Sequence, residues 1–212
     1  MSPKTMMAGV VHALYDSSIR SKTIDIELIE NDPDQGKKVL TAVEEGLQTC
    51  NSFFMSVAFI NQSGLTPLLL TLQELERKNI KGKVLTTNYL SFSEPKALDA
   101  LEQLKNIEVR MADTSSNAPG FHTKGYVFFQ KEWVRMMIGS SNITAGALTR
   151  NKEWNVQVKA SSKGSLSQSV MDAFETMWND RKTIPYGDIR EEYVRQYEQK
   201  QQMQKKEEEE EE

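Results

Sequence analysis

The sequence predicts an α/β fold in one main domain, built around a mostly parallel sheet. Its 212 residues suit one compact core with a short appendage. Short β-type runs alternate with segments of helical apolar spacing through the first half of the chain, and such alternation favours parallel strands joined by right-handed crossovers. With 38% hydrophobic and 26% charged residues, the composition is that of an ordinary globular protein, not of a fibrous or disordered one.

The first half of the chain switches repeatedly between helical and strand spacing. Apolar residues recur on one helical face over residues 35–49, and the run 53–60 is apolar on both faces, as in a buried strand. Ser93, followed by an acidic residue and Pro95, is typical of a helix start. The elements expected in order are a helix around 8–19, a strand or sheet edge at 23–29, a helix at 35–49, a strand at 53–60, a helix at 65–77, a strand at 82–87, a helix at 93–106 and a strand at 107–111.

The second half begins with a loop of turn-forming residues at 113–120. Two β-type runs separated by three residues then predict a hairpin, and beyond Pro185 the sequence turns to Gln, Lys and Glu. The expected elements are strands at 121–129, 133–138 and 155–160 and a helix at 165–180. We divide the chain into an N-terminal extension at 1–34, a main domain at 35–184 and a charged tail, helical or disordered, at 185–212.

The net charge of −4 conceals an uneven distribution. Residues 191–212 hold nine acidic and four basic residues, whereas residues 1–190 hold 21 acidic and 22 basic residues. The acidic balance therefore belongs to the tail, and the main body is neutral enough to carry a local basic patch. The composition does not exclude nucleic acid as a partner.

The small numbers of cysteine and histidine residues limit which disulfides and metal sites this chain can form. The single cysteine, Cys50, cannot form an internal disulfide and lies beside an apolar run, which indicates a buried thiol in a reducing compartment, the cytoplasm. With two histidines and one cysteine, no Cys/His set of four zinc ligands exists. The longest apolar runs are far shorter than the roughly 20 residues that a membrane helix needs.

One constellation in the second half is typical of phosphate chemistry. His122 and Lys124 lie two apart in a β-type run, so their side chains are expected on one face. The sequence Gly-Ser-Ser-Asn at 139–142 follows at a strand-to-loop turn, where N–H groups, hydroxyls and an amide can point at one anion. Either feature alone is usually structural, but the combination, with Glu153 after it, is far more specific.

Together, His122-x-Lys124, Gly139-Ser140-x-Asn142 and Glu153 resemble the H-x-K and G-S-x-N motif of the phospholipase D superfamily with its trailing acidic residue. The likeness is greatest to the nuclease branch, meaning metal-independent restriction endonucleases and helicase-linked nuclease domains, and covers roughly residues 36–180. It implies a phospholipase D-like α/β fold with a mostly parallel mixed sheet flanked by helices on both faces. The fuller family motif has an aspartate where this chain has Phe129, which makes lipid hydrolysis the weaker expectation.

The resemblance assigns roles to these residues. His122 would attack phosphorus and form a phosphohistidine that water later resolves, while Lys124 and Asn142 hold the non-bridging oxygens. Ser140 would assist through its hydroxyl or backbone, and Glu153 would bond a ring nitrogen of a histidine and fix its tautomer. No metal ion or other cofactor is expected. The candidate contacts to the DNA backbone are Ser141, Thr144 and Lys131.

The expected function is metal-independent DNA cleavage by the nuclease component of a restriction or helicase-linked DNA-processing system. The family reaction needs two histidines, whereas this chain has one such motif and His12 lacks a matching lysine. A homodimer with a composite active site is therefore expected. The further partners expected are DNA and a helicase or DNA-recognition subunit, and no association with a membrane is expected. Two alternatives stay open: a catalytically silent DNA-binding or dimerisation module, and a lipid phosphodiesterase, which would favour an apolar surface at the site.

Overall fold

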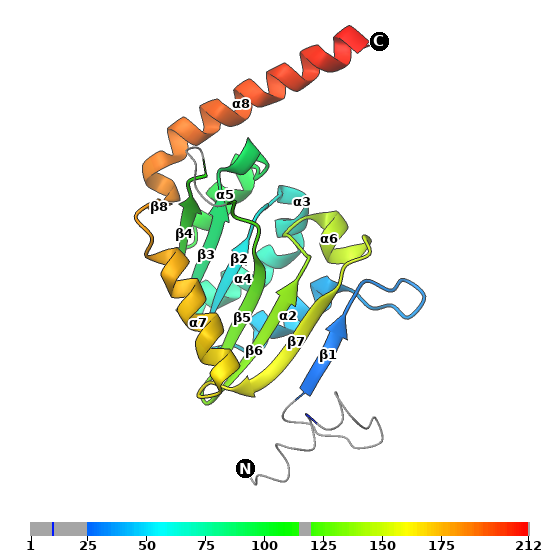
Figure 1. The fold of residues 1–212 in the computed structure, drawn as a ribbon, viewed down its shortest axis with the longest axis vertical. Coiled ribbons are helices and arrows are strands. Elements are labelled where there is room, and N and C mark those ends of the chain that lie inside the picture. Colours follow the sequence, from blue (N-terminus) through cyan, green and yellow to red (C-terminus); the bar gives the residue numbers. More distant parts are fainter. Residues whose placement is uncertain (1–9, 11–24, 115–119, 212) are drawn as a thin grey trace.

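The computed structural model describes Val10, residues 25–114 and residues 120–211, and these residues form one eight-stranded mixed sheet with helices on both faces (Figure 1). In sheet order the strands are β1 (Asp25–Ile29), β7 (Asn155–Ser161), β6 (Trp133–Gly139), β5 (Lys124–Gln130), β2 (Ser52–Val57), β3 (Lys81–Thr87), β4 (Ile107–Ala112) and β8 (Thr183–Pro185). The predicted α/β class is confirmed. The helix predicted around residues 8–19 lies outside the described residues.

The sheet is less parallel than the sequence predicted. Among the described strands, β2 pairs with β3 and β3 with β4 in parallel, whereas the other five neighbouring pairs are antiparallel. Parallel pairing needs a crossover connection, and a helical segment joins β2 to β3 and another joins β3 to β4. β5 and β6 are joined by a tight turn at Lys131 and Glu132, which forces the antiparallel hairpin that the sequence did predict.

Two apolar cores, one on each face of the sheet, hold the helices. The larger core includes Val43, Leu72 and Leu98 from the helices on one face, and the smaller core lies under α7 on the other (Figure 1). In the described part of the chain, no helix is both long and apolar enough to cross a bilayer. The helices are α2 (Val39–Thr49), α3 (Gln62–Leu65), α4 (Leu69–Arg77), α5 (Pro95–Glu102), α6 (Ala145–Thr149), α7 (Ser165–Trp178) and α8 (Tyr186–Glu211), with 3-10 turns η1 (Thr66–Leu68) and η2 (Tyr89–Ser91).

Local hydrogen bonds move two helix starts from their predicted positions. The Asp32 carboxylate accepts from the backbone N–H groups of Asp34 (3.0 Å) and Gln35 (3.1 Å), so these residues form a turn and α2 begins at Val39. Ser93 does not cap α5, because its hydroxyl accepts from the N–H of Ile60 at 3.1 Å. These side chains compete with helix formation for backbone donors.

The predicted extension and tail both contribute to the packed body. β1 pairs with β7 at the sheet edge, and the first half of α8 packs against α5. Tyr186 and Tyr193 of α8 are 0% and 2% exposed and belong to the larger core. Arg190 forms two 2.7 Å hydrogen bonds to Asp99 of α5, which holds the pKa of that carboxyl below its usual range. The rest of α8 extends away from the sheet (Figure 1).

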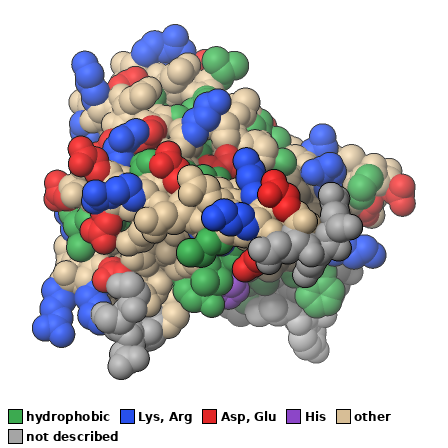
Figure 2. Space-filling view, turned by 90° about the horizontal axis from the view of Figure 1, so that it is seen from above, with side chains coloured by type: hydrophobic (Ala, Val, Ile, Leu, Met, Phe, Trp, Pro, Cys, Tyr) green, Lys and Arg blue, Asp and Glu red, His purple; other side chains and the backbone are tan. Residues whose placement is uncertain are grey.

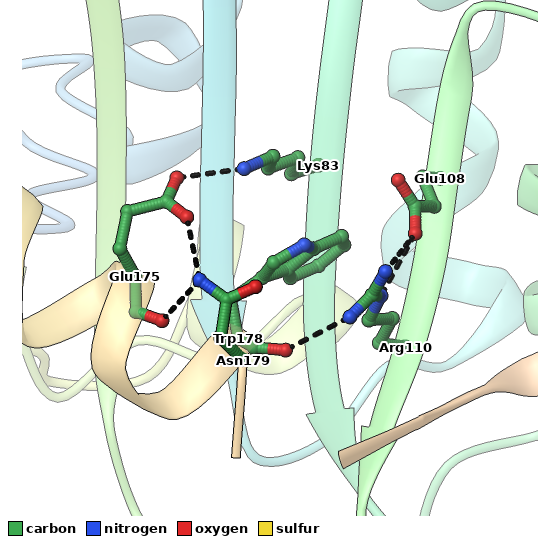
Figure 3. A network of polar contacts seen from close by, with 6 residues as sticks. All are labelled: Lys83, Glu108, Arg110, Glu175, Trp178 and Asn179. Atoms are coloured by element: carbon green, nitrogen blue, oxygen red, sulfur yellow. Dashed lines mark hydrogen bonds and ion pairs between the residues drawn. The ribbon is translucent and has the colours of Figure 1, made fainter. Parts of the chain in front are cut away.

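The C-terminal end of α7 is fixed to β3 and β4 by a small polar network (Figure 3). Lys83 donates to Glu175 at 2.6 Å, and the guanidinium of Arg110 donates to the Trp178 carbonyl at 3.0 Å while lying 4.7 Å from its ring centroid. Burial of Trp178 and of Phe174 contributes more, because a large buried apolar side chain stabilises by about 2–3 kcal/mol and an exposed ion pair by at most about 1 kcal/mol.

Cys50 is buried, as predicted, and follows the last residue of α2. Burial raises the pKa of its thiol to about 11, and the thiol donates to the Leu47 carbonyl at 3.2 Å. Because only the thiolate is a strong nucleophile, Cys50 is a packing residue at neutral pH.

Candidate active site

His122 and Lys124 lie at the end of the sheet where β2 ends and β5 begins. Lys124 pairs with Val57, the last residue of β2, and His122 precedes β5 as an exposed residue. The side chains of His122 and Lys124 were expected on one face of a strand. Because β5 starts only at Lys124, strand geometry does not set the direction of the His122 side chain. The two residues are joined instead by a hydrogen bond from Lys124 Nζ to the His122 carbonyl oxygen at 2.9 Å. Figure 2 looks down on this end of the molecule and shows a surface histidine with hydrophobic side chains beside it.

Two contacts hold the segment that carries His122 against β2. The hydroxyl groups of Thr123 and the buried Ser56 are 2.6 Å apart and share a hydrogen bond. On the other side, the Phe59 ring lies edge-on to the imidazole, with ring centroids 6.3 Å apart. The imidazole is thus positioned by its neighbours while its surface stays open to solvent.

Lys124 supplies a buried positive charge at the site. The residue is 8% exposed, and burial lowers the pKa of its ammonium group, while the nearby Glu153 carboxylate acts in the opposite direction. An ammonium group has three donors, and the bond to the His122 carbonyl uses one of them. The others can bind an anion at the mouth of the site. Within the described residues, no three His, Cys, Asp or Glu side chains gather where they could hold a metal ion.

The turn at 139–142 is pressed against β2 and β7. A Cβ at Gly139 would lie 2.2 Å from the Trp154 carbonyl oxygen, so glycine is required there by the close approach of the two backbones. Asn142 Oδ1 accepts from the N–H of Phe59 at 3.1 Å. With its carbonyl engaged in this way, the amide of Asn142 keeps its NH2 group as the end that can donate to a substrate.

Ser140 and Glu153 form a hydrogen-bonded pair beside this turn. The Ser140 hydroxyl donates to Glu153 Oε2, and the backbone N–H of Trp154 donates to the same hydroxyl at 3.1 Å. Among the described residues, no hydrogen bond joins Glu153 to His122. The histidine contact expected of Glu153 therefore stays a prediction, and in a single chain the carboxylate orients Ser140 and faces the charge of Lys124.

The three candidate DNA contacts are placed less favourably. Ser141 is fully buried and its hydroxyl accepts from Asn155 Nδ2 at 2.9 Å, which leaves no exposed group for a phosphate. Thr144 uses its hydroxyl to cap α6, accepting from the N–H of Ala147 at 3.2 Å. Lys131 lies just beyond the far end of β5, a strand of seven residues that spans roughly 20 Å at the usual rise per residue, whereas His122 lies before its first residue. In the single chain, neither Ser141 nor Lys131 is placed to contact a phosphate held at His122, and the DNA contacts expected of Ser141, Thr144 and Lys131 stay predictions.

Sequence reasoning missed two residues that connect the parts of the site. Phe59 contacts the His122 ring and bonds Asn142 through its backbone, but its apolar run was interpreted only as strand interior. Asn155 is 1% exposed and accepts from the Ser141 N–H at 3.3 Å while its own amide donates to the Ile29 carbonyl. The sequence could have indicated a role for Asn155, because this polar residue begins a β-type run at a position whose alternation predicts a buried side chain.

Replacing Glu153 by glutamine should slow catalysis and shift its pH dependence without unfolding the chain. The role predicted for Lys124 needs its charged ammonium group, whose pKa is lowered by burial and raised by the Glu153 carboxylate. Glutamine carries no negative charge to raise the pKa of Lys124, so this pKa falls further. The ammonium group then loses its proton at a lower pH, and the alkaline limb of the pH–rate profile shifts to lower pH. A pH–rate profile with a thermal melt checks this; a large drop in Tm with unchanged activity per folded molecule would make Glu153 structural.

Comparison with known proteins places this site in context. The family described as "Cardiolipin synthase, PLD-like domain" matches residues 47–178, a segment that contains His122, Lys124, the 139–142 turn and Glu153. No curated protein matches the chain by sequence.

Three solved structures share the fold at low sequence identity. NucT from Helicobacter pylori is 12% identical with a TM-score of 0.60, covering 76% of this chain and 99% of its own. Nuc from Salmonella typhimurium, a phospholipase D family member, is 19% identical with a TM-score of 0.59, covering 77% and 98%. Phosphatidylserine synthase from Haemophilus influenzae is 9% identical with a TM-score of 0.58, covering 77% of this chain and 40% of its own.

Proposed function

The chain belongs to the phospholipase D superfamily, and we propose that it is a metal-independent phosphodiesterase that cleaves DNA through a phosphohistidine at His122. The observation that carries this proposal is the meeting of an exposed imidazole, a buried ammonium and an amide donor at one end of the sheet. Nucleophile and oxyanion-stabilising groups are the two requirements of phosphoryl transfer. The choice of DNA rests on the resemblance of the motif and its sequence context to the nuclease branch of the family, since the fold itself is shared with a phosphatidylserine synthase as well as with NucT and Nuc.

The reaction takes two balanced steps at these residues. A ring nitrogen of His122 attacks phosphorus and the bond to the leaving oxygen breaks, with a second imidazolium giving that oxygen its proton. Water then loses a proton to the second imidazole and attacks phosphorus, which breaks the P–N bond and restores His122. Lys124 and Asn142 stabilise the charge that develops on the non-bridging oxygens in both steps.

The second imidazole would come from the partner subunit's His122 in a homodimer. The sheet offers a surface for such contact on the face that carries α7. Leu28, Val156 and Ile138 are cross-strand neighbours in one row and are 52%, 48% and 46% exposed. Ile138 is also the register partner of Gly125, which follows Lys124. An uncovered apolar row that reaches the site suits an isologous contact which brings two active sites together.

DNA cleavage should persist in excess EDTA. Lys124 and Asn142 supply the positive charge and the donor that a metal ion would otherwise provide, so chelation removes nothing that the reaction needs. Plasmid nicking measured with EDTA, and with Mg²⁺ as the matched control, should give equal rates within about two-fold. Strict dependence on Mg²⁺ would contradict the mechanism.

A lipid phosphodiesterase is the second candidate, favoured by one specific observation. A pocket of about 310 Å³ opens beside His122 and is lined mainly by apolar side chains, including Val127, Val170 and Phe174. Cleavage of phosphatidyl headgroups in mixed micelles, assayed beside plasmid DNA, separates the two functions. Lipid turnover faster than DNA turnover would favour this candidate, whereas binding of DNA without turnover of either would favour a silent module.

A further inference from the structure

A short loop at the end of β3 presents large apolar side chains to solvent near the site. Tyr89, Leu90 and Phe92 are 45%, 52% and 42% exposed. Exposed aromatic side chains in one segment are uncommon, because each gains free energy by burial. The loop therefore has a feature that packing of this chain alone does not explain.

The loop is held in a conformation that its residues disfavour. Leu90 and Ser91 have φ of 49° and 47°, the left-handed region that non-glycine residues rarely adopt. The turn is fixed at its start, where Thr87 Oγ1 accepts from the Tyr89 N–H at 3.1 Å and the Asn88 carbonyl accepts from the Ser91 N–H at 3.0 Å. These hydrogen bonds thus hold Leu90 and Ser91 in an unfavourable backbone conformation, in which the apolar side chains of the loop stay exposed to solvent.

The loop is connected to the reacting imidazole through a chain of rings. Phe92 lies edge-on to Phe59 with ring centroids 4.9 Å apart, and Phe59 in turn lies 6.3 Å from His122. One aromatic residue therefore separates Phe92 from the proposed nucleophile. A group attached to a phosphate at His122 would reach this surface.

Helix α8 fixes the loop from the opposite side. Tyr193 donates to the Ser93 carbonyl at 2.8 Å, just after the loop. Lys200 Nζ lies 3.6 Å from the centroid of the Phe92 ring and donates to the Leu90 carbonyl oxygen. The loop therefore combines aromatic side chains with a cation, the combination that single-stranded nucleic acid binds best.

We propose that the loop formed by residues 89–92 stacks against unpaired bases beside the scissile phosphate and gives the enzyme a preference for single-stranded DNA. The inference rests on the proposed function and adds the substrate's strandedness to it. In a duplex the faces of the bases are covered by their neighbours, so only unpaired bases can stack on these rings. A lipid acyl chain has no π-face and no charge for Lys200 to complement.

The test compares a single-stranded oligonucleotide with an abasic phosphodiester of equal length. The unmodified chain should cleave both and prefer the oligonucleotide by about ten-fold in kcat/KM, because stacking contributes about this factor per base. Tyr89→Ala and Phe92→Leu should lose most of that preference while cleaving the abasic strand at the original rate. Phe92→Leu keeps an apolar side chain and removes the π-face, so it separates stacking from general hydrophobic contact.

Controls distinguish this inference from the proposed function. Leu70→Ala, at an apolar side chain on α4 that is 75% exposed, should leave the preference unchanged. Cleavage of both strands with equal kcat/KM in the unmodified chain and both variants would overturn the base-binding role and leave the nuclease proposal intact. Cleavage of neither strand would overturn the nuclease proposal itself. A change in sedimentation of Tyr89→Ala would assign the loop to a contact between subunits instead.

Discussion

Replacing His122 by alanine should lower the rate of DNA cleavage by about 10⁴-fold or more, since the variant lacks the proposed nucleophile. Binding of DNA should change little, because Lys124 and Asn142 keep their phosphate contacts. Single-turnover cleavage and equilibrium binding, measured on the same preparation, check the two halves of this expectation. Unchanged cleavage would remove His122 from the mechanism.

The covalent intermediate can be detected directly. Substrate labelled at the scissile phosphate should transfer its label to the unmodified protein in an acid-labile, base-stable bond, and not to His122→Ala. Lys81→Ala is the matched control, because this lysine begins β3 beside Ser52, at the opposite end of the sheet from His122, and should leave both cleavage and labelling unchanged. Stable label on the alanine variant would assign the intermediate to another residue.

The sequence predicted which residues meet at the site better than it predicted how they are held. The order His122, Lys124, Asn142 and Glu153 was sufficient to place them at one end of the sheet, because a chemical motif constrains spacing. It was not sufficient to show that His122 precedes its strand, since no glycine or proline separates Phe121 from Lys124 to mark the strand start. Strand boundaries depend on pairing with β2, which is a long-range property.

Local polar side chains caused the errors in helix starts and in the secondary contacts of the site. Ser93 has the pattern of a helix cap, yet its hydroxyl bonds Ile60 from another element. Ser141 looks like an exposed turn residue, yet it is buried by its exchange of hydrogen bonds with Asn155. In each case the competing partner is distant in sequence, so no local pattern indicates it. The left-handed Leu90 is a further example, because its strain is maintained by α8 and β3 together.

The shape of the sheet bears on the number of subunits in the active enzyme. Five of the seven neighbouring pairs among the described strands are antiparallel, and the strands β1, β7 and β6 end in an exposed apolar row on the α7 face. Exposed apolar rows are costly in a monomer and typical of contacts between subunits. Since the proposed reaction needs a second imidazole, a subunit contact at this row would supply what the single motif lacks.

Disrupting this contact should remove most of the activity. Val156→Asp places a charge in the centre of the apolar row, so the chain should sediment as a monomer and lose cleavage by about 10³-fold or more, because proton transfer to the leaving oxygen is lost. Leu70→Asp, on the opposite face of the sheet, is the control and should stay dimeric and active. A monomeric, fully active Val156→Asp would rule out a shared site.

Subunit mixing gives a second and independent measurement of the same prediction. After exchange with an excess of His122→Ala, each mixed dimer holds one imidazole where the reaction needs two. Cleavage should then fall with the square of the fraction of unmodified subunits, whereas independent sites would make it fall in proportion to that fraction. Dilution of the unmodified enzyme should also lower its specific activity near the dissociation constant of the dimer. Activity proportional to the unmodified fraction at every mixing ratio would show that each chain completes the reaction with its own residues, and the second proton carrier would then have to lie within one subunit.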